Sequence, residues 1–386
     1  MLSAQGCQQR RRALWAALPE PKPNLLIIVD PLHVNYLANF WVSPFSFRGQ
    51  NAAAALLLAA DGRCRLVADN LLEPFAAQAH VDELVAPTWY DGTGTPEERG
   101  SVLIDAIVAA GRAMLRSGKS WASELDHLPA EAARQLGTPP TADLGPILQR
   151  LRYTKGEDEL KLLRRSAQAS AAGLAAARDG LRPGMTELDL FHLVQQAVQE
   201  FLGEPTPIYG DFVSGPRTAA GGGGPIRRRL EAGDLVLVDF SPIVRGYRAD
   251  VCSTWRLADD FDAEQQRLAR ACQEALAAGI DALRPGRPAS AVHQALVQAF
   301  RRLGLADFFP HHAGHGVGLA HPEAPFLTPA SDNDLAPGMV VTLEPGLYLP
   351  KRFGLRLEHN FLITADGCER LTRHEPLPPP VPSFNA

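Results

Sequence analysis

A repeat within the second half of the chain is the feature that most restricts how it can fold. Residues 230–239 (LEAGDLVLVD) recur 105 positions later as residues 335–344 (LAPGMVVTLE). Glycine matches glycine, an aliphatic run matches an aliphatic run, and the closing acid Asp239 matches Glu344. A pattern that occurs only twice indicates an internal pseudo-twofold, because a solenoid needs about three or more repeats.

A second echo supports the same interpretation. Residues 181–184 (LRPG) recur as residues 283–286, and each copy precedes a stretch of helical composition. The two echoes have nearly the same offset. They predict that the region from about 155 to 372 consists of two copies of one helix-then-hairpin unit. The alternative at this point is chance similarity between two ordinary glycine-strand segments.

The first copy ends in a pair of acids that a hairpin would bring together. Residues 235–239 are large aliphatic residues closed by a carboxylate, which is typical of a buried strand with an acid at its end. Asp250 follows eleven residues after Asp239, and the turn at Arg245 and Gly246 lies between them. Because buried carboxylates without a counter-charge are costly, such a pair predicts a bound cation.

Histidines and glutamates later in the chain extend this acid pair. Four histidines lie close together among glycines, a pattern that core packing does not explain: His311, His312, His315 and His321. Glu358 follows Glu344 in a further strand-like stretch. Two aspartates, two glutamates and one imidazole would form an oxygen-rich site for two divalent ions about 3.5–4 Å apart. This ligand set favours manganese, with cobalt, iron or zinc as alternatives.

Composition restricts the class of protein further. At 386 residues, with 46% hydrophobic and 21% charged residues, the chain is predicted to be a two-domain globular protein. A net charge of −5 does not indicate nucleic acid or an anionic membrane surface as a partner. Five scattered cysteines without a CxxC motif argue against a disulfide framework and predict a cytoplasmic location. No apolar run approaches the length of a membrane span, about 18 residues.

Local signals predict several elements around these motifs. Residues 54–58 are expected to form a strand paired with residues 64–68 across the Asp61-Gly62 turn, despite their helical composition. Acidic residues at 157–159 suit the first turn of a long helix that ends near Asp179. Thr186 is expected to open another helix, which ends near Glu200.

Taken in order, the motifs resemble those of the pita-bread superfamily, which includes Xaa-Pro aminopeptidases, prolidases, methionine aminopeptidases and creatinase. They are two aspartates eleven residues apart, then Gly-His-Gly-x-Gly, Glu-Pro-Gly-x-Tyr and Gly-x-Arg-x-Glu. Residues 24–150 are similar to the N-terminal domain of the creatinase and prolidase branch, notably at Asp30-Pro31 and Asn35-Tyr36-Leu37. The resemblance implies an α/β (α+β) fold. Its parts would be a creatinase-like N-terminal domain (1–150), a pseudo-twofold pita-bread catalytic domain (151–375) and a proline-rich tail (376–386).

The resemblance also implies roles for individual residues. Two divalent metal ions, bridged by Asp250 and Glu358, would have five ligands: Asp239, Asp250, His315, Glu344 and Glu358. Glu344 would also move a proton. His311 and His321 would contact the substrate and steady the oxyanion or leaving nitrogen, and Arg356 would help to bind the substrate. Such proteins are often dimers, so we expect a homodimer. We expect it to act on a small peptide or small amide, with neither nucleic acid nor membrane as a partner.

Two positions on the substrate side depart from the family pattern. Proline-specific members carry a histidine in the loop before the first metal strand, and an ungapped alignment places Gly222 there. Gly222 lies in a run of four glycines, 221–224, which no Lys-Ser/Thr follows and which therefore does not predict a phosphate loop. The histidine that is usual seven residues after the metal histidine is replaced by Pro322, with His321 beside it.

Three functions follow from this pattern. In the first, a dimetal hydrolase resembling Xaa-Pro aminopeptidases uses a metal-bridging hydroxide to cleave the amide bond between an N-terminal residue and proline. Gly222 and Pro322 favour the second, a small-molecule C–N hydrolase or lyase of the creatinase or ectoine-hydrolase type. The third is a non-enzymatic binding module. Such modules tend to lose metal ligands, and this chain keeps all five.

Overall fold

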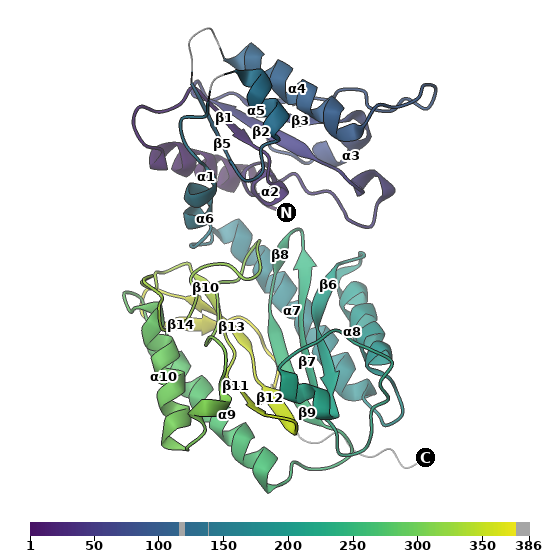
Figure 1. Cartoon of the computed structure of the whole chain (residues 1–386), viewed down its shortest axis with the longest axis vertical. Coiled ribbons are helices and arrows are strands. Elements are labelled where there is room, and N and C mark those ends of the chain that lie inside the picture. Colours follow the sequence, from purple (N-terminus) through teal and green to yellow (C-terminus); the bar gives the residue numbers. More distant parts are fainter. Residues whose placement is uncertain (116–119, 138, 376–386) are drawn as a thin grey trace. The chain divides into compact units, whose positions relative to one another are not determined.

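The computed structural model describes residues 1–115, 120–137 and 139–375, and the predicted proline-rich tail lies outside the described residues. The chain divides into two compact units, Met1–Arg152 and Tyr153–Ala386. Each unit has its own strands and helices (Figure 1), and each has its own cluster of buried hydrophobic residues.

The first unit is a five-stranded mixed sheet with helices, and its strand order is β4-β3-β2-β1-β5. Its strands are β1 (Leu25–Ile28), β2 (Ala54–Ala59), β3 (Cys64–Ala68), β4 (Glu83–Val85) and β5 (Trp121–Ser123). Its helices are α1 (Ala4–Ala17), α2 (Pro31–Ala38), α3 (Glu73–Ala76), α4 (Arg99–Met114), α5 (Ala130–Leu136) and α6 (Gly145–Leu151), with short 3₁₀ turns η1 (Phe47–Gly49) and η2 (Asn70–Leu72).

Tertiary pairing overrides local propensity in β2. Its six residues are mostly alanine and leucine, which favour helix, but all six are buried and the strand pairs antiparallel with β1 on one side and β3 on the other. The predicted strand at 54–58 and its pairing with 64–68 are therefore confirmed.

The second unit contains a long pair of helices, a set of strands, and then the same combination again. Its helices are α7 (Glu157–Gly180), α8 (Glu187–Leu202), α9 (Ala263–Ala282) and α10 (Ala289–Arg302), with 3₁₀ turns η3 (Gly215–Ala220) and η4 (Ala306–Phe308). Its strands are β6 (Ile208–Ser214), β7 (Leu235–Val244), β8 (Tyr247–Arg248), β9 (Val251–Arg256), β10 (Val340–Leu343), β11 (Gly346–Leu349), β12 (Phe353–Arg356), β13 (His359–Ile363) and β14 (Cys368–Arg370).

Capping explains where the helices of the first pair begin. Three acidic residues lie in the first turn of α7, where the helix dipole favours negative charge. The hydroxyl of Thr186 accepts from the backbone of Asp189, whose side chain accepts in return from the Thr186 backbone, and this capping box starts α8. The start of α8 predicted at Thr186 is confirmed.

Equivalent backbone contacts confirm the internal repeat. In the first half, the Gly184 amide donates to the Leu230 carbonyl at 2.8 Å. In the second half, the Gly286 amide donates to the Leu335 carbonyl at 2.7 Å. These four residues occupy matching positions in the two sequence echoes, so the echoes reflect one structural unit used twice.

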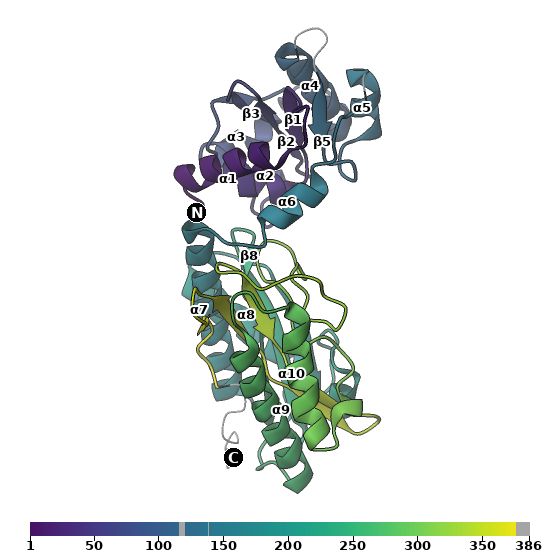
Figure 2. The same ribbon diagram turned by 90° about the vertical axis from the view of Figure 1, so that its left-hand side faces the viewer.

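The helices lie on the outside of the second unit and the strands lie between them. α7 and α8 stand beside β6–β9, and α9 packs along α10 next to the C-terminal strands (Figures 1 and 2). Cys252 and Glu358 form a β-bridge that connects the strands of the two halves. This arrangement brings the middle of β7, the start of β9 and the C-terminal ends of β10 and β12 close together.

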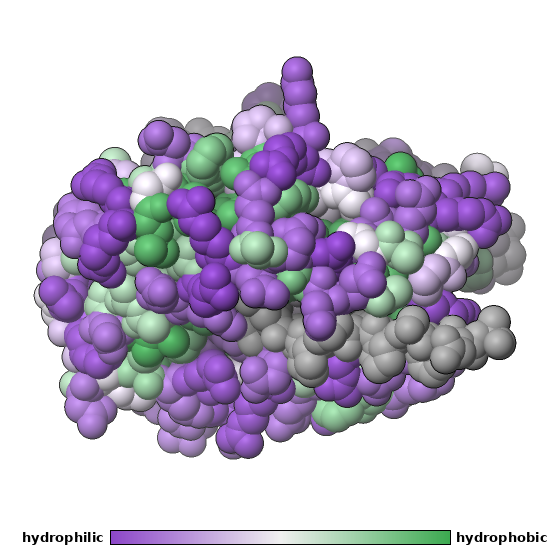
Figure 3. Space-filling view, turned by 90° about the horizontal axis from the view of Figure 1, so that it is seen from below, coloured by the Kyte–Doolittle hydropathy of each residue, from purple (hydrophilic) through white to green (hydrophobic). Residues whose placement is uncertain are grey.

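Hydrophilic side chains predominate on the face seen from below, with smaller hydrophobic areas between them (Figure 3). Among the described residues, no helix has the length and apolar character needed to cross a membrane.

Candidate metal centre

The hairpin of β7 with β9 brings the first two acids together, as the sequence predicted. Asp239 lies in the middle of β7 opposite Cys252, and Phe240 lies opposite Val251. Asp250, which immediately precedes β9, therefore lies beside Asp239. Ser241, in β7, donates its hydroxyl to Asp250 Oδ1 at 2.9 Å and so orients that carboxylate.

The second half contributes the other three predicted residues to the same place. Glu344 follows β10, Glu358 lies between β12 and β13, and His315 comes from the loop after α10. Ligand atoms of Asp239, Asp250 and Glu358 lie within 4.8 Å of one another, and so do those of His315, Glu344 and Glu358. The two groups share Glu358, which is the position expected of a bridging carboxylate.

The buried carboxylates of this cluster favour a bound cation. Glu358 is only 2% exposed, and within the described chain its Oε1 has no hydrogen-bond partner. Burial and the neighbouring charges of Asp250, Asp239 and Glu344 raise the pKa of Glu358 well above its ordinary value. Burial also raises the pKa of Asp239 to about 7. A positive ion among these oxygens would remove both penalties, so the residues fit a divalent metal.

The orientation of His315 fits the same ion. Its Nδ1 lies 2.9 Å from the Gly316 carbonyl, which can only accept, so Nδ1 carries the proton. In the neutral ring, Nε2 then has a free lone pair, and it lies 3.6 Å from Asp250 Oδ2 and 3.7 Å from Glu344 Oε1. Without a cation between them, a lone pair directed at two carboxylates is electrostatically unfavourable. It is the usual arrangement of a metal-binding histidine held by a backbone carbonyl.

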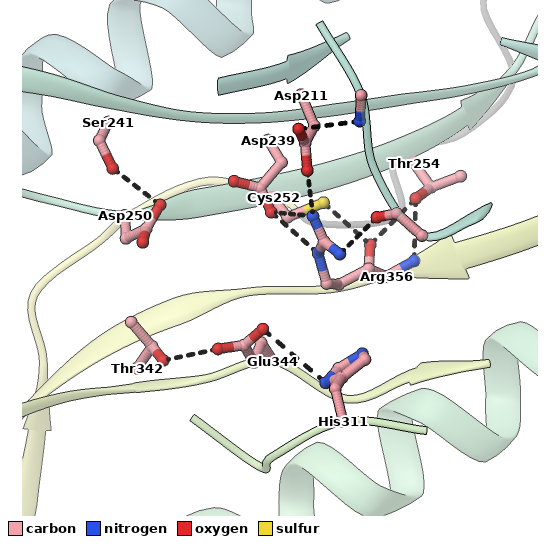
Figure 4. Close-up of polar contacts among 12 residues, drawn as sticks. Asp211, Asp239, Ser241, Asp250, Cys252, Thr254, His311, Thr342, Glu344 and Arg356 are labelled. Atoms are coloured by element: carbon pink, nitrogen blue, oxygen red, sulfur yellow. Dashed lines mark hydrogen bonds and ion pairs between the residues drawn. The ribbon is translucent and has the colours of Figure 1, made fainter. Parts of the chain in front are cut away.

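Arg356 uses its whole guanidinium on protein acceptors (Figure 4). Nε and Nη2 donate to Asp239 Oδ2 at 2.8 and 2.5 Å, and Nη2 also approaches Asp211 Oδ2 at 3.4 Å. Nη1 donates to the Gly221 carbonyl at 2.7 Å and to the Tyr348 hydroxyl at 3.0 Å. A guanidinium has five N–H donors, so none is left over for a substrate carboxylate. This geometry favours a positioning role for Arg356, and the substrate contact expected from the sequence stays a prediction.

Three histidines surround the acid cluster. His321 Nε2 lies 2.7 Å from Asp250 Oδ2, so this side chain does reach the site from beside Pro322. His312 Nδ1 lies 3.3 Å from Glu344 Oε1, and the contact raises the pKa of His312. His311 lies farther from Glu344, at 4.0 Å, and its Nε2 pairs with the Tyr348 hydroxyl at 3.1 Å. The site therefore has imidazoles on two sides of the carboxylates.

The glycine run takes a specific form at Gly222. A Cβ built on Gly222 would lie 2.1 Å from Asp211 Oδ2, a distance at which two such atoms overlap. The backbone amide of the next residue, Gly223, donates to Asp211 Oδ1 at 2.9 Å. Asp211 therefore occupies the space that a side chain at position 222 would need, and its hydrogen bond with the backbone fixes the loop.

Sequence reasoning missed three members of the site. His312 was visible as part of the histidine run, and Tyr348 ends the Glu-Pro-Gly-x-Tyr motif, so both had a signal. Asp211 had none, because it lies on β6 opposite Asp239 and its contact with the glycine loop depends on the folded backbone.

Comparisons with known proteins agree with this site. The model of "Metallopeptidase family M24" matches residues 161–365, which include all five predicted ligands. An uncharacterized peptidase of Staphylococcus aureus is 26% identical over 90% of this chain and 94% of its own length. The dipeptidase PepE of Mycobacterium ulcerans is 26% identical, with a TM-score of 0.78 over 98% of this chain and 99% of that one. An Xaa-Pro dipeptidase from Bacillus anthracis shares the fold, with 24% identity and a TM-score of 0.80 over 97% of this chain and 98% of that one.

These likenesses confirm the predicted fold, in which an N-terminal domain precedes a pita-bread catalytic domain. The family model covers more than half of the chain and includes the carboxylate and histidine cluster. The chain therefore belongs to metallopeptidase family M24 and is a metallohydrolase.

Proposed function

We propose that the protein is a dimetal peptidase that removes an N-terminal residue preceding proline from a dipeptide or short peptide. The observation that carries the proposal is the buried Glu358 carboxylate, which has an oxygen without a hydrogen-bond partner in the described chain and lies among other acids. Two similar solved structures are a dipeptidase and an Xaa-Pro dipeptidase, and they suggest the substrate class.

Five residues would hold the two metal ions: Asp239, Asp250, His315, Glu344 and Glu358. Manganese is our first choice, because four carboxylates and one imidazole form a mostly oxygen ligand set. Such ions, when bound, would activate a water molecule and polarise the carbonyl of the bond to be cleaved.

The chain's own residues would handle the protons and the substrate. The contact with His312 and the charges of the neighbouring histidines outweigh the effect of burial and lower the pKa of Glu344 to about 2. Glu344 is thus ionised at neutral pH, the state needed to receive a proton from the attacking water. His321 lies against Asp250, where its ring could donate to the oxyanion or the leaving nitrogen. His311 lies against Tyr348, and in its neutral ring the Nδ1 proton is directed at the His312 carbonyl, 2.8 Å away.

A small-molecule C–N hydrolase is the second candidate, and one observation favours it. The Asp211 carboxylate occupies the space that a side chain at position 222 would need, so this position cannot hold the histidine that the sequence pattern of proline-specific members leads us to expect there.

Hydrolysis of matched Xaa-Pro and Xaa-Ala dipeptides and tripeptides, followed by mass spectrometry, tests the proposal. Each reaction is run with added manganese, cobalt or zinc and with a chelated control. Metal-dependent release of the residue before proline, lost in Glu358→Gln but kept in Asp366→Asn on an exposed turn, supports the peptidase. A protein that binds about two metals per chain but cleaves no peptide contradicts it and favours the second candidate.

The remaining features of the proposal concern the whole protein. We propose that residues 151–375 carry the catalysis, that residues 1–150 form the accessory N-terminal domain, and that the protein works as a homodimer. We propose a reducing compartment such as the cytoplasm, because the five cysteines are scattered along the sequence without a CxxC motif. Size-exclusion chromatography with light scattering measures the oligomeric state.

A further inference from the structure

Asp211 is a carboxylate beside the metal centre that the proposed mechanism does not use. It lies on β6 directly opposite Asp239 on β7, so two acids share one cross-strand position (Figure 4). Like charges at such a position are destabilising. Arg356 lies between the two carboxylates but serves them unequally, with contacts of 2.5 and 2.8 Å to Asp239 and one of 3.4 Å to Asp211.

The Asp211 carboxylate is also accessible. Its side chain is 37% exposed, compared with 13% for Asp239. One oxygen accepts from the Gly223 amide, and the other makes, among the residues that the structure describes, only the long contact with Arg356. A carboxylate has about four acceptor positions, so Asp211 keeps free positions for donors on a ligand.

Asp211 excludes a side chain at position 222 of the glycine run. A Cβ on Gly222 would lie 2.1 Å from Asp211 Oδ2 and 2.8 Å from its Cγ. At this position the loop can therefore lie against Asp211 only as backbone, and the polar side-chain group here is the Asp211 carboxylate.

We propose that Asp211 is a specificity-determining residue that selects substrates in which the side chain next to the cleaved bond is cationic, an amine or a guanidinium. The inference rests on the proposed hydrolytic function. It goes beyond that function because an acid at this position repels a substrate carboxylate and attracts a cation. An amine or guanidinium can donate to the free positions of Asp211, and a neutral side chain of the same size cannot.

Substrate pairs that differ only in charge test the inference. Peptides in which arginine is replaced by citrulline, or lysine by norleucine, are compared at the positions before and after the cleaved bond. For the wild type, we expect kcat/KM to favour the cationic member about tenfold, and we expect 0.5 M salt to reduce the preference. In Asp211→Asn, which keeps the size and the acceptor for Gly223, the ratio should fall to about one through a higher KM for the cationic member alone.

A binding measurement separates this inference from the peptidase proposal. Calorimetry of arginine amide and citrulline amide with the metal-loaded protein needs no turnover. If no peptide is cleaved but the wild type binds arginine amide more tightly than Asp211→Asn does, the peptidase proposal fails and Asp211 keeps its role. If the variant changes the cationic and neutral members equally, Asp211 only supports the loop and the inference is overturned. Asp366→Asn is the control for the loss of one surface charge.

Discussion

Replacing Arg356 with methionine tests whether this residue is the internal counter-charge of the acidic centre. The guanidinium is 8% exposed and donates to Asp239, Asp211, the Gly221 carbonyl and the Tyr348 hydroxyl. Methionine fills much of the same volume without a charge. It leaves the buried Asp239 carboxylate facing Asp211 with no cation between them.

The expected loss of stability is large for a single substitution. Removing one partner of a buried ion pair costs about 3–5 kcal/mol, because the remaining charge stays buried. We therefore expect the metal-free Arg356→Met protein to lose about 3–5 kcal/mol in its free energy of unfolding. Arg352→Met is the matched control. The Arg352 side chain is 56% exposed and pairs with Glu264, so its loss should leave the free energy of unfolding nearly unchanged.

The same substitution should change how metal binding depends on pH. The pKa of Asp239 is about 7 even though the Arg356 charge lowers it. Without Arg356 the pKa rises further, so at pH 7 a proton competes more strongly with the metal for Asp239. We expect metal affinity at pH 7 to fall by at least about tenfold and to recover as the pH rises toward 9.

Urea unfolding of the chelated proteins and metal titration against a chromophoric chelator at pH 6 to 9 measure both effects. Arg356→Lys, which keeps the charge but not the five-donor fork, should lie between the wild type and Arg356→Met. A loss below about 1 kcal/mol together with an unchanged pH profile of metal binding would refute the idea that Arg356 is the internal counter-charge of the site.

Three further predictions concern the centre and its loop. Glu358→Gln should remain folded by circular dichroism but bind less than half of the wild-type metal by elemental analysis; full metal content would contradict its bridging role. Arg217→Met removes the partner of the buried Glu187, which also anchors the backbone amide of the glycine loop at Ile226. It should cost about 3 kcal/mol in urea unfolding and raise KM more than it lowers kcat. Gly222→Ala should cost about 1–3 kcal/mol through overlap with Asp211, and Asp211→Ala in the same chain should restore most of it; equal losses in the single and double variants would count against the overlap.

Residues that are close in the sequence made much of the site predictable. Asp239 and Asp250 belong to one hairpin, so the strand period and the turn at Gly246 were enough to place them together. The two echoes gave the internal repeat, because a repeated fold keeps its glycines where the backbone turns. The hydrogen bond between Gly184 and Leu230 and its counterpart in the second half show that the repeated glycines make equivalent backbone contacts.

Contacts between distant segments were beyond the sequence. Arg356 and Asp239 are 117 positions apart in the sequence. No local sequence pattern around Arg356 indicates that its guanidinium donates to groups inside the protein. Asp211 looked like an ordinary polar residue of a strand. Its importance depends on the path of the loop at Gly222, which only the folded chain defines.

The division of the centre between the two halves has a mechanical consequence. Asp239 and Asp250 come from the first half, whereas His315, Glu344 and Glu358 come from the second, and a β-bridge at Cys252 and Glu358 is among the contacts that join the halves. A cation bound by ligands from both halves would connect the two similar halves. Pulling either half away would release the ion, so metal occupancy would report directly on whether the halves remain docked.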